Sequence, residues 1–213
     1  MLKIYGFDFS TPSNAVRMWA NAIGLEHEYV NVNLPEGENQ ADAYLALNPT
    51  AKVPAIDDDG FTLGESVAIM KYISRKHGAP FYPPDFAAQA AVDQWYSFVS
   101  VHIYMAMVRV FYNKVAAPQL SLAIDEQSLA DGQQFLAKFL PVVDKQLAAH
   151  RYLAGDDLTI ADFAMLSFLD PTEIVDLDLR PYPKLTAWRD GLRAERWYQD
   201  VHGCFGESMM AAE

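Results

Sequence analysis

Four small hydrogen-bonding side chains stand close together near the start of the chain. They are Ser10, Thr11, Ser13 and Asn14, in the string "STPSN", which separates an apolar segment from an amphipathic one. A hydroxyl at such a turn can cap the following helix by accepting a backbone hydrogen bond. It can also donate to an anion held by the free N–H groups of the helix N-terminus. Thr11-Pro12 is typical of a helix cap and first-turn pair, so we expect the Thr11 side chain to cap.

A second candidate is the string "NPTAKVPAI", which runs from Asn48 to Ile56. Pro54 opens a predicted strand, where its missing N–H must face away from the ladder. If the Val53–Pro54 bond is cis, the bend leaves the N–H and C=O of Val53 free to bind an extended peptide as an added strand. An ordinary edge strand that begins with proline is the alternative.

A third candidate is "GESVAIMKY", where a predicted strand gives way to a helix. The hydroxyl of Ser66 and the first free N–H groups of that helix can bind a carboxylate, while Glu65 can pair with an ammonium. Together they would bind the free end of an amino acid. The alternative is that Glu65 or Ser66 only caps the helix.

The elements that must position these residues follow from the apolar pattern. Residues 2–7 and 29–34 are predicted strands that flank a helix ended by Gly24, so the chain begins with a βαβ unit. A short helix before Asn48-Pro49, two strands and a helix up to Gly78 follow. The acidic run at 57–59 leads into Gly60 and predicts a hairpin turn between those strands rather than a metal site. After the proline-rich string "GAPFYPPDF" only helical patterns occur, at residues 86–113, 123–150, 159–170 and 183–197.

Composition narrows the possible partners. The net charge is −12, which argues against nucleic acid as a ligand. The single cysteine, Cys204, excludes a disulfide framework, and the five histidines never fall at metal-ligand spacing. The chain shows neither a signal peptide nor an apolar run long enough to span a membrane. We therefore expect a cytoplasmic globular protein that binds no metal, nucleic acid or membrane.

Taken in order, the three strings resemble the cytosolic glutathione transferase family, and the similarity covers both halves of the chain. The resemblance implies an α/β plus all-α fold: a thioredoxin-like domain at residues 1–78, a linker at 79–86 and an all-helical domain at 87–213. In that family the residue before the cis-proline pairs its backbone with the cysteinyl part of glutathione, which here is Val53 before Pro54. Lys52 would then reach the glycyl carboxylate, and Glu65 and Ser66 would hold the γ-glutamyl end.

The "LTIADF" string of the helical half resembles the family's capping box, with Thr159 as the helix cap and Asp162 three residues later. We expect this motif to be structural rather than catalytic. It predicts that Thr159 stabilises the protein without contacting glutathione.

The same resemblance implies what the opening turn does. Family subclasses use Tyr, Ser or Cys to stabilise the glutathione thiolate, and here no cysteine precedes residue 204 and Tyr5 lies inside the predicted strand. A zeta-like alignment selects Ser10 as the catalytic donor, although Pro12 stands where that pattern has a cysteine. A theta-like alignment selects Ser13, and phi-like or nu-like patterns favour Thr11 and Asn14. We take Ser10 first and Ser13 second, with Thr11 and Asn14 as glutathione contacts.

The electrophile is expected to bind between the two domains. Its walls would come from the turn and from Tyr104, Met107, Val108 and Phe111, although their helical spacing is more typical of a core than of a binding wall. The tail "HGCFGESMM" could fold over this pocket. We therefore expect a homodimeric, metal-free transferase that uses glutathione as co-substrate and attacks small hydrophobic electrophiles. A glutathione-dependent isomerase or peroxidase, or a non-catalytic ligand-binding member of the fold, is the alternative.

Overall fold

The computed structural model describes residues 1–78 and 81–202. The first part is built on a four-stranded sheet with the order β2-β1-β3-β4. Strand β1 pairs in parallel with β2, whereas the pairs β1–β3 and β3–β4 are antiparallel. This arrangement agrees with the predicted βαβ start followed by a hairpin. The strands are β1 (Leu2–Gly6), β2 (Glu28–Asn31), β3 (Ala55–Asp58) and β4 (Phe61–Gly64).

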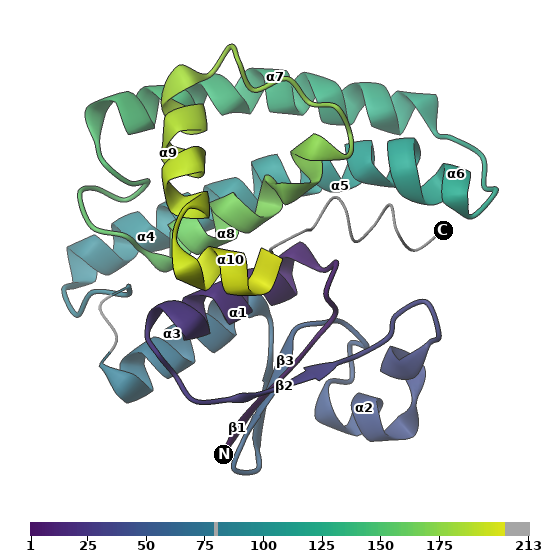
Figure 1. Ribbon diagram of the computed structural model, residues 1–213, viewed down its shortest axis with the longest axis vertical. Helices are drawn as coiled ribbons and strands as arrows, with labels where there is room; N and C mark the ends of the chain where they lie inside the picture. The colour runs from purple at the N-terminus through teal and green to yellow at the C-terminus, as the bar shows by residue number, and fades with distance from the viewer. Residues whose placement is uncertain (79–80, 203–213) are drawn as a thin grey trace.

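Helices cover both faces of this sheet. Helices α1 (Thr11–Ala22) and α3 (Ser66–His77) lie on the face toward the helical part, and α2 (Asp42–Leu47) lies on the other (Figure 1). Successive side chains of a strand point to opposite faces. Accordingly Ile4 is fully buried in the core with α1 and α3, while its neighbour Tyr5 packs in the smaller cluster with Tyr44 of α2. A 3-10 turn, η1 (Glu38–Gln40), precedes α2.

The turns that define the sheet follow the sequence closely. Asp59 and Gly60 both have positive φ values, 53° and 94°, and the Asp57 carboxylate accepts a hydrogen bond from the Gly60 N–H at 2.7 Å. The predicted Asp-Gly hairpin is therefore confirmed. Strand β2 is shorter than the alternation of residues 29–34 predicts. It ends at Asn31 because its partner β1 ends at Gly6, the last residue of their register.

The second part is helical. From Phe86 to Gln119 five helical elements follow one another directly, two of them π-helical, whereas the sequence predicts one regular helix over residues 86–113. The predicted helix over 183–197 is likewise divided, near Ala194, into two helices that cross at a steep angle (Figure 1). The elements are α4 (Phe86–Phe98), η2 (Val99–Tyr104), α5 (Met105–Phe111), η3 (Tyr112–Ala116), α6 (Ala117–Gln119), α7 (Glu126–Ala149), α8 (Ile160–Phe168), η4 (Asp170–Glu173), α9 (Pro183–Arg193) and α10 (Arg196–His202).

A single apolar core joins the two parts. It runs from Ile4 and Trp19 in the first part to Phe163 and Trp188 in the second, and α1 packs against both α8 and α10. The hydroxyl of Ser167 on α8 also donates to the carbonyl of Thr11 at the start of α1. The helical part therefore fixes the position of the helix that carries the "STPSN" turn. In the described ranges, no helix is both long enough and apolar enough to cross a membrane.

The start of α8 forms the predicted capping box. The buried Asp162 carboxylate accepts hydrogen bonds from the N–H and the hydroxyl of Thr159, both at 2.9 Å, and from the Leu153 N–H at 3.0 Å. Burial raises the pKa of Asp162 to about 6 even though these hydrogen bonds lower it. The carboxylate thus holds together the loop before α8 and the helix itself.

Candidate active site

Three segments that the sequence singles out lie at the same end of neighbouring strands of the sheet. Tyr5 of β1 pairs with Ala55 of β3, and Ala55 pairs with Gly64 of β4. The "STPSN" turn follows β1 after three intervening residues, Glu65 directly follows β4, and Pro54 directly precedes Ala55. Neighbouring strands are about 4.8 Å apart. The register therefore brings the three candidate strings side by side.

Ser10 caps helix α1. Its backbone is extended (φ −86°, ψ 108°), and its side-chain oxygen accepts a long hydrogen bond, 3.4 Å, from the N–H of Ser13. Capping uses a lone pair of the hydroxyl oxygen, so the hydroxyl hydrogen stays available to a further acceptor. A cap and a donor can thus be the same group.

The expectation that Thr11 is the cap is wrong. Thr11 is the first residue of α1 and Pro12 the second, so Ser10 takes the capping position. Proline is tolerated throughout the first helical turn because the N–H groups there have no partner inside the helix. Thr11 is buried, and its carbonyl accepts the hydrogen bond from Ser167.

Ser13 and Asn14 do not line the cavity described below, and they support the turn. Both are fully buried. The Ser13 side-chain oxygen accepts a hydrogen bond from the N–H of Phe7. Ser13 also packs tightly on Gly6, because a Cβ added at residue 6 would lie 2.9 Å from the Cβ of Ser13. The Asn14 amide donates to the carbonyl of Asp8 at 2.6 Å and its oxygen accepts from Arg17 at 3.2 Å. These contacts fix the path of residues 7–10.

Val53 precedes a cis peptide bond to Pro54, which is the alternative that the family resemblance implies. The strand pairing of β3 begins only at Ala55, so the backbone of half-buried Val53 lies outside the ladder. The preceding residue, Lys52, has an exposed side chain, and its carbonyl accepts hydrogen bonds from Tyr44 and from Asn48, both at 2.7 Å. This loop therefore offers a cation and backbone groups beside the "STPSN" turn.

Glu65 and Ser66 form the start of α3. Glu65 has a positive φ of 66°, a conformation that a residue with a side chain adopts at an energetic cost and that clusters at functional sites. Its side chain is exposed. Ser66 is buried, and its hydroxyl lies 2.7 Å from the hydroxyl of Tyr96 on α4. The helical part thus contacts the serine directly.

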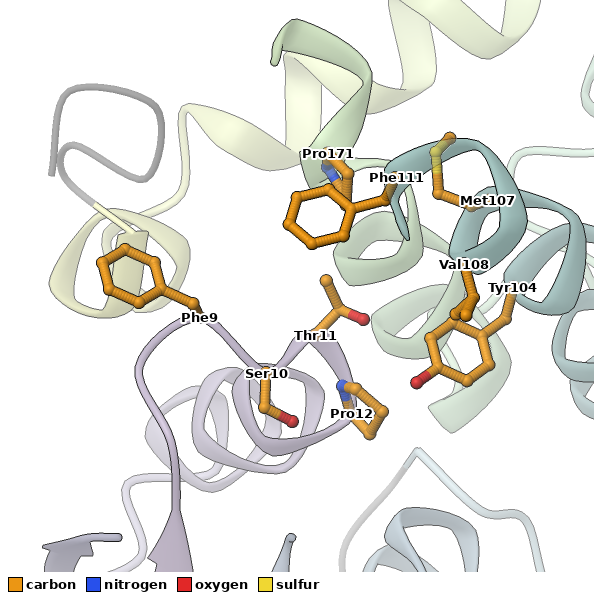
Figure 2. Close-up of a pocket in the computed structure, with 9 residues that line it drawn as sticks. All are labelled: Phe9, Ser10, Thr11, Pro12, Tyr104, Met107, Val108, Phe111 and Pro171. Atoms are coloured by element: carbon orange, nitrogen blue, oxygen red, sulfur yellow. The ribbon is translucent and has the colours of Figure 1, made fainter. Parts of the chain in front are cut away.

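A cavity of about 160 Å³ opens beside the turn. All four predicted pocket residues line it together with Ser10 and Thr11. The structure therefore brings the turn next to the helical elements η2 and α5, which carry those four residues (Figure 2). Met107 is also almost fully buried, so the same side chain belongs to the cavity wall and to the apolar core. None of the nine described lining residues is charged. They are Phe9, Ser10, Thr11, Pro12, Tyr104, Met107, Val108, Phe111 and Pro171.

Sequence reasoning missed Phe9, Pro171 and Tyr96. Tyr96 lies eight residues before Tyr104, a spacing that puts both on one helical face and could have revealed it. Burial raises the pKa of both tyrosines, and the nearby Glu65 carboxylate raises it further. The tail from residue 203 onward, with Cys204, lies outside the described residues. Within residues 1–78 and 81–202, no three His, Cys, Asp or Glu side chains are grouped to hold a metal ion.

Comparison with protein families gives two matches along the chain. Residues 1–75 match the family described as "Glutathione S-transferase, N-terminal domain", and residues 86–195 match "Glutathione S-transferase, C-terminal domain". Among curated proteins, glutathione S-transferase theta-1 of Homo sapiens is 32% identical over 94% of this chain and 87% of its own length. Glutathione S-transferase D7 of Anopheles gambiae is 32% identical, over 97% and 94% of the two chains.

Solved structures agree with the sequence matches. The apo form of human glutathione-S-transferase T1-1 superposes with a TM-score of 0.88 at 31% identity, covering 96% of this chain and 89% of that one. A glutathione S-transferase-I bound with lactoylglutathione has a TM-score of 0.86 at 27% identity, over 95% and 98% of the two chains.

Proposed function

Because this chain belongs to the glutathione S-transferase family, we propose that the hydroxyl of Ser10 donates a hydrogen bond to the sulfur of bound glutathione. The protein is a glutathione transferase, which activates the glutathione thiolate for attack on small hydrophobic electrophiles. Glutathione is thus a substrate that is consumed. The proposal concerns the residues of this chain that bind and activate it.

The observation that supports Ser10 is its position as a helix cap that lines the cavity. Lowering a thiol pKa by about 2 units from about 8.5 requires that the anion be favoured by roughly 2.7 kcal/mol. A hydrogen bond to a charged group contributes about 1.5–3 kcal/mol, and a helix N-terminus adds about 0.3–1 kcal/mol. The two effects together are therefore large enough. Ser13, the second candidate, is fully buried against Gly6 and does not line the cavity.

Four neighbouring residues would bind the rest of the tripeptide. The backbone of Val53, set by Pro54, would pair with the cysteinyl unit, and Lys52 would attract the glycyl carboxylate. Glu65 would pair with the γ-glutamyl ammonium, and the hydroxyl and N–H groups at Ser66 would bind its carboxylate. Thr11, which lines the cavity, completes the proposed glutathione contacts at the turn. Asn14 is also a predicted contact, but it is fully buried and bonded to Asp8 and Arg17, so it would support the turn rather than touch glutathione.

The electrophile would occupy the cavity of about 160 Å³ that Tyr104, Met107, Val108 and Phe111 line. Its apolar, uncharged lining favours a small neutral molecule. In this proposal residues 1–78 form the glutathione-binding domain, residues 79–86 the linker and residues 87–213 the domain that supplies the electrophile pocket.

We also propose that the enzyme is a cytoplasmic homodimer. The apolar side chains of Val101 and Met105 are 60% and 50% exposed one helical turn apart, which suits a surface that a second copy covers. Light scattering of the purified protein measures the assembly directly. A mass of one chain at micromolar concentration would contradict it.

Calorimetric titration with glutathione tests the binding assignment. Glu65→Gln removes the charge that pairs with the ammonium, so we expect about tenfold weaker binding. Glu36→Gln, at another exposed glutamate, is the matched control and should bind as the unchanged protein does. Equal affinities for the two variants would contradict the role of Glu65, and absence of binding at millimolar glutathione would contradict the function. Product analysis with an electrophile, a maleyl ketone and an organic peroxide separates transfer from isomerase or peroxidase activity.

A further inference from the structure

The outer face of the sheet, on the side away from the helical part, carries a groove of its own. Helix α2 lies against this face (Figure 1), but it has only six residues. Between α2 and the strands lies an open groove of about 620 Å³. It shares no described lining residue with the cavity beside the "STPSN" turn, so the two hollows are separate.

The floor of this outer groove is apolar and aromatic. Tyr5 of β1 and Tyr44 of α2 meet there edge to face, with ring centroids 6.4 Å apart and an interplanar angle of 71°. Val30 and Leu47, both half-buried, line the groove beside them. Such a floor favours a flat hydrocarbon body, and aromatic rings also attract cations to their faces.

The two charged side chains among the described lining residues of the groove are both carboxylates. They are Asp57 of β3 and Glu38 of η1. One oxygen of each is held by the backbone, since Asp57 accepts from the N–H of Gly60 and Glu38 from that of Asn33, both at 2.7 Å. In residues 1–78 and 81–202 neither carboxylate forms an ion pair. The groove therefore presents two fixed negative charges beside an apolar floor.

The cation nearest to these charges in the strand register is engaged elsewhere. Lys3 is the Cα partner of Asp57 across β1 and β3, and its amino group pairs with Glu28 on β2 at 3.3 Å. The exposed Asp42 at the start of α2 adds a further negative charge close to the lining residues Ala41 and Ala43. The balance of charge around the groove is thus negative.

We propose that the outer groove is a binding site for an organic cation that carries its ammonium group on a flat apolar body. The ammonium would lie against Asp57 and Glu38, and the hydrocarbon would lie on the floor that Tyr5 and Tyr44 form. An anion of the same shape would meet two carboxylates, and a neutral molecule would leave both without a partner. The inference is independent of the proposed function, since it needs neither glutathione nor a thiolate.

Calorimetric titration of the full-length protein with three matched probes tests the charge preference. The probes are 1-naphthylmethylamine, which is protonated at pH 7, the neutral 1-naphthalenemethanol and the anionic 1-naphthaleneacetate. At low ionic strength we expect the cation to bind about fivefold more tightly than the alcohol, because an exposed ion pair contributes modestly. The preference should disappear in about 1 M salt, where the Debye length is about 3 Å. S-hexylglutathione should not displace the cation, because the groove is separate from the cavity.

Two amide variants locate the charges. Asp57→Asn and Glu38→Gln each keep the oxygen that accepts the backbone hydrogen bond and remove the charge. Each should weaken binding of the cation about threefold and leave binding of the alcohol unchanged. Asp59→Asn is the matched control, because Asp59 belongs to the same hairpin, pairs with the amino group of Met1 and does not line the groove. Its affinity for the cation should equal that of the unchanged protein.

A lysine placed in the groove tests the same claim without changing either carboxylate. Ala43 is exposed on α2 and lines the groove, and lysine is a good helix former. Ala43→Lys should weaken binding of the cation about fivefold or more. Ala148→Lys adds the same charge at an exposed position of α7 and should not. Equal melting temperatures would show that both variants are folded.

Several results would overturn the inference. Equal affinities for the cation and the alcohol would mean that the carboxylates recognise nothing. A loss in Asp59→Asn or Ala148→Lys as large as in the groove variants would mean that the cation responds only to the net charge of the protein. Displacement by S-hexylglutathione would place the probe in the cavity beside the turn. Absence of binding at millimolar probe would also contradict the site. None of these results bears on glutathione transfer, which the titration with glutathione tests separately.

Discussion

At the scale of single residues, the turn after β1 depends on a small polar network. Arg17 lies over the ring of Tyr29, 3.8 Å from its centroid, and donates from one nitrogen to the Asp8 carboxylate at 3.0 Å and to Asn14. The hydroxyl of Tyr29 donates to the same carboxylate oxygen at 3.0 Å. Because Asn14 also holds the carbonyl of Asp8, the network ties the turn that carries Ser10 to α1 and β2.

Replacing Arg17 by lysine tests this network. Lysine keeps the charge but lacks the planar group that stacks on Tyr29 while donating to Asp8 and Asn14, so we expect a loss of about 1 kcal/mol of stability. Arg180→Lys is the matched control, because Arg180 is 90% exposed and pairs only with Asp178 among the described residues, so its melting temperature should hardly change. Equal melting temperatures for the two variants would show that the network contributes nothing.

Sequence patterns predict the positions of the candidate site residues better than they predict the contacts of those residues. The positions of Val53-Pro54 and Glu65-Ser66 beside the turn follow from strand order, which the apolar pattern reveals. The Thr-Pro pair predicts Thr11 as the cap, but the path of the loop places Ser10 at the cap and Thr11 inside the helix. The bond from Ser66 to Tyr96 joins residues 30 positions apart, and no local pattern signals it.

At the scale of elements, helix α8 connects the capping box to the turn of α1. Its first residues are held by Asp162, and its last turn carries Ser167, which bonds Thr11. All nine residues of α8 are buried, so the helix is the centre of the second part. The position of the "STPSN" turn therefore depends on how well this helix begins.

Thr159→Ala measures that dependence. The substitution removes a hydroxyl donor to the buried Asp162 carboxylate, so we expect a loss on the order of 1 kcal/mol in the free energy of unfolding. Glutathione affinity should be unaltered, because Thr159 contacts no proposed ligand group. Thr62→Ala, at an exposed threonine of β4, is the control. A melting temperature equal to that of this control would contradict the structural role of the capping box.

Element order was more predictable than helix geometry. The βαβ start, the hairpin and the caps at Gly24, Gly78 and Thr159 each follow from local signals that the structure retains. The π-helical segments η2 and η3 could not be predicted, since apolar spacing in residues 99–116 fits an ordinary helix as well. Gly191 lies inside α9, three residues before the break near Ala194, and no glycine or proline stands at the break itself. The break sends α9 against α7 and α10 against α1, so tertiary packing decides it.

At the scale of the whole molecule, the two family-matched regions share one apolar core. Trp19 in α1 and Trp188 in α9 belong to the same buried cluster. The polar bonds from Ser167 to Thr11 and from Tyr96 to Ser66 cross between the regions as well. Local sequence patterns could not predict these contacts, because they join residues that lie far apart in the sequence.

The shared core predicts a single unfolding transition. In two variants that each keep one tryptophan, Trp19 or Trp188, the fluorescence transition in urea should coincide with the far-ultraviolet circular dichroism transition of the same variant. The reason is that neither half buries its apolar surface without the other. Two separated midpoints in either variant would show that the halves unfold independently.

The central claim is that Ser10 stabilises the glutathione thiolate, and the pKa of the bound thiol tests it most directly. The ultraviolet absorbance of the thiolate is recorded against pH for the unchanged protein and for Ser10→Ala, Thr11→Ala and Ser13→Ala. Removing the donor should raise the thiol pKa in Ser10→Ala by about 1 unit or more, toward the free value of about 8.5, whereas Ser13→Ala should leave it unchanged. An unchanged thiol pKa in Ser10→Ala, with a raised one in Ser13→Ala or Thr11→Ala, would contradict the claim.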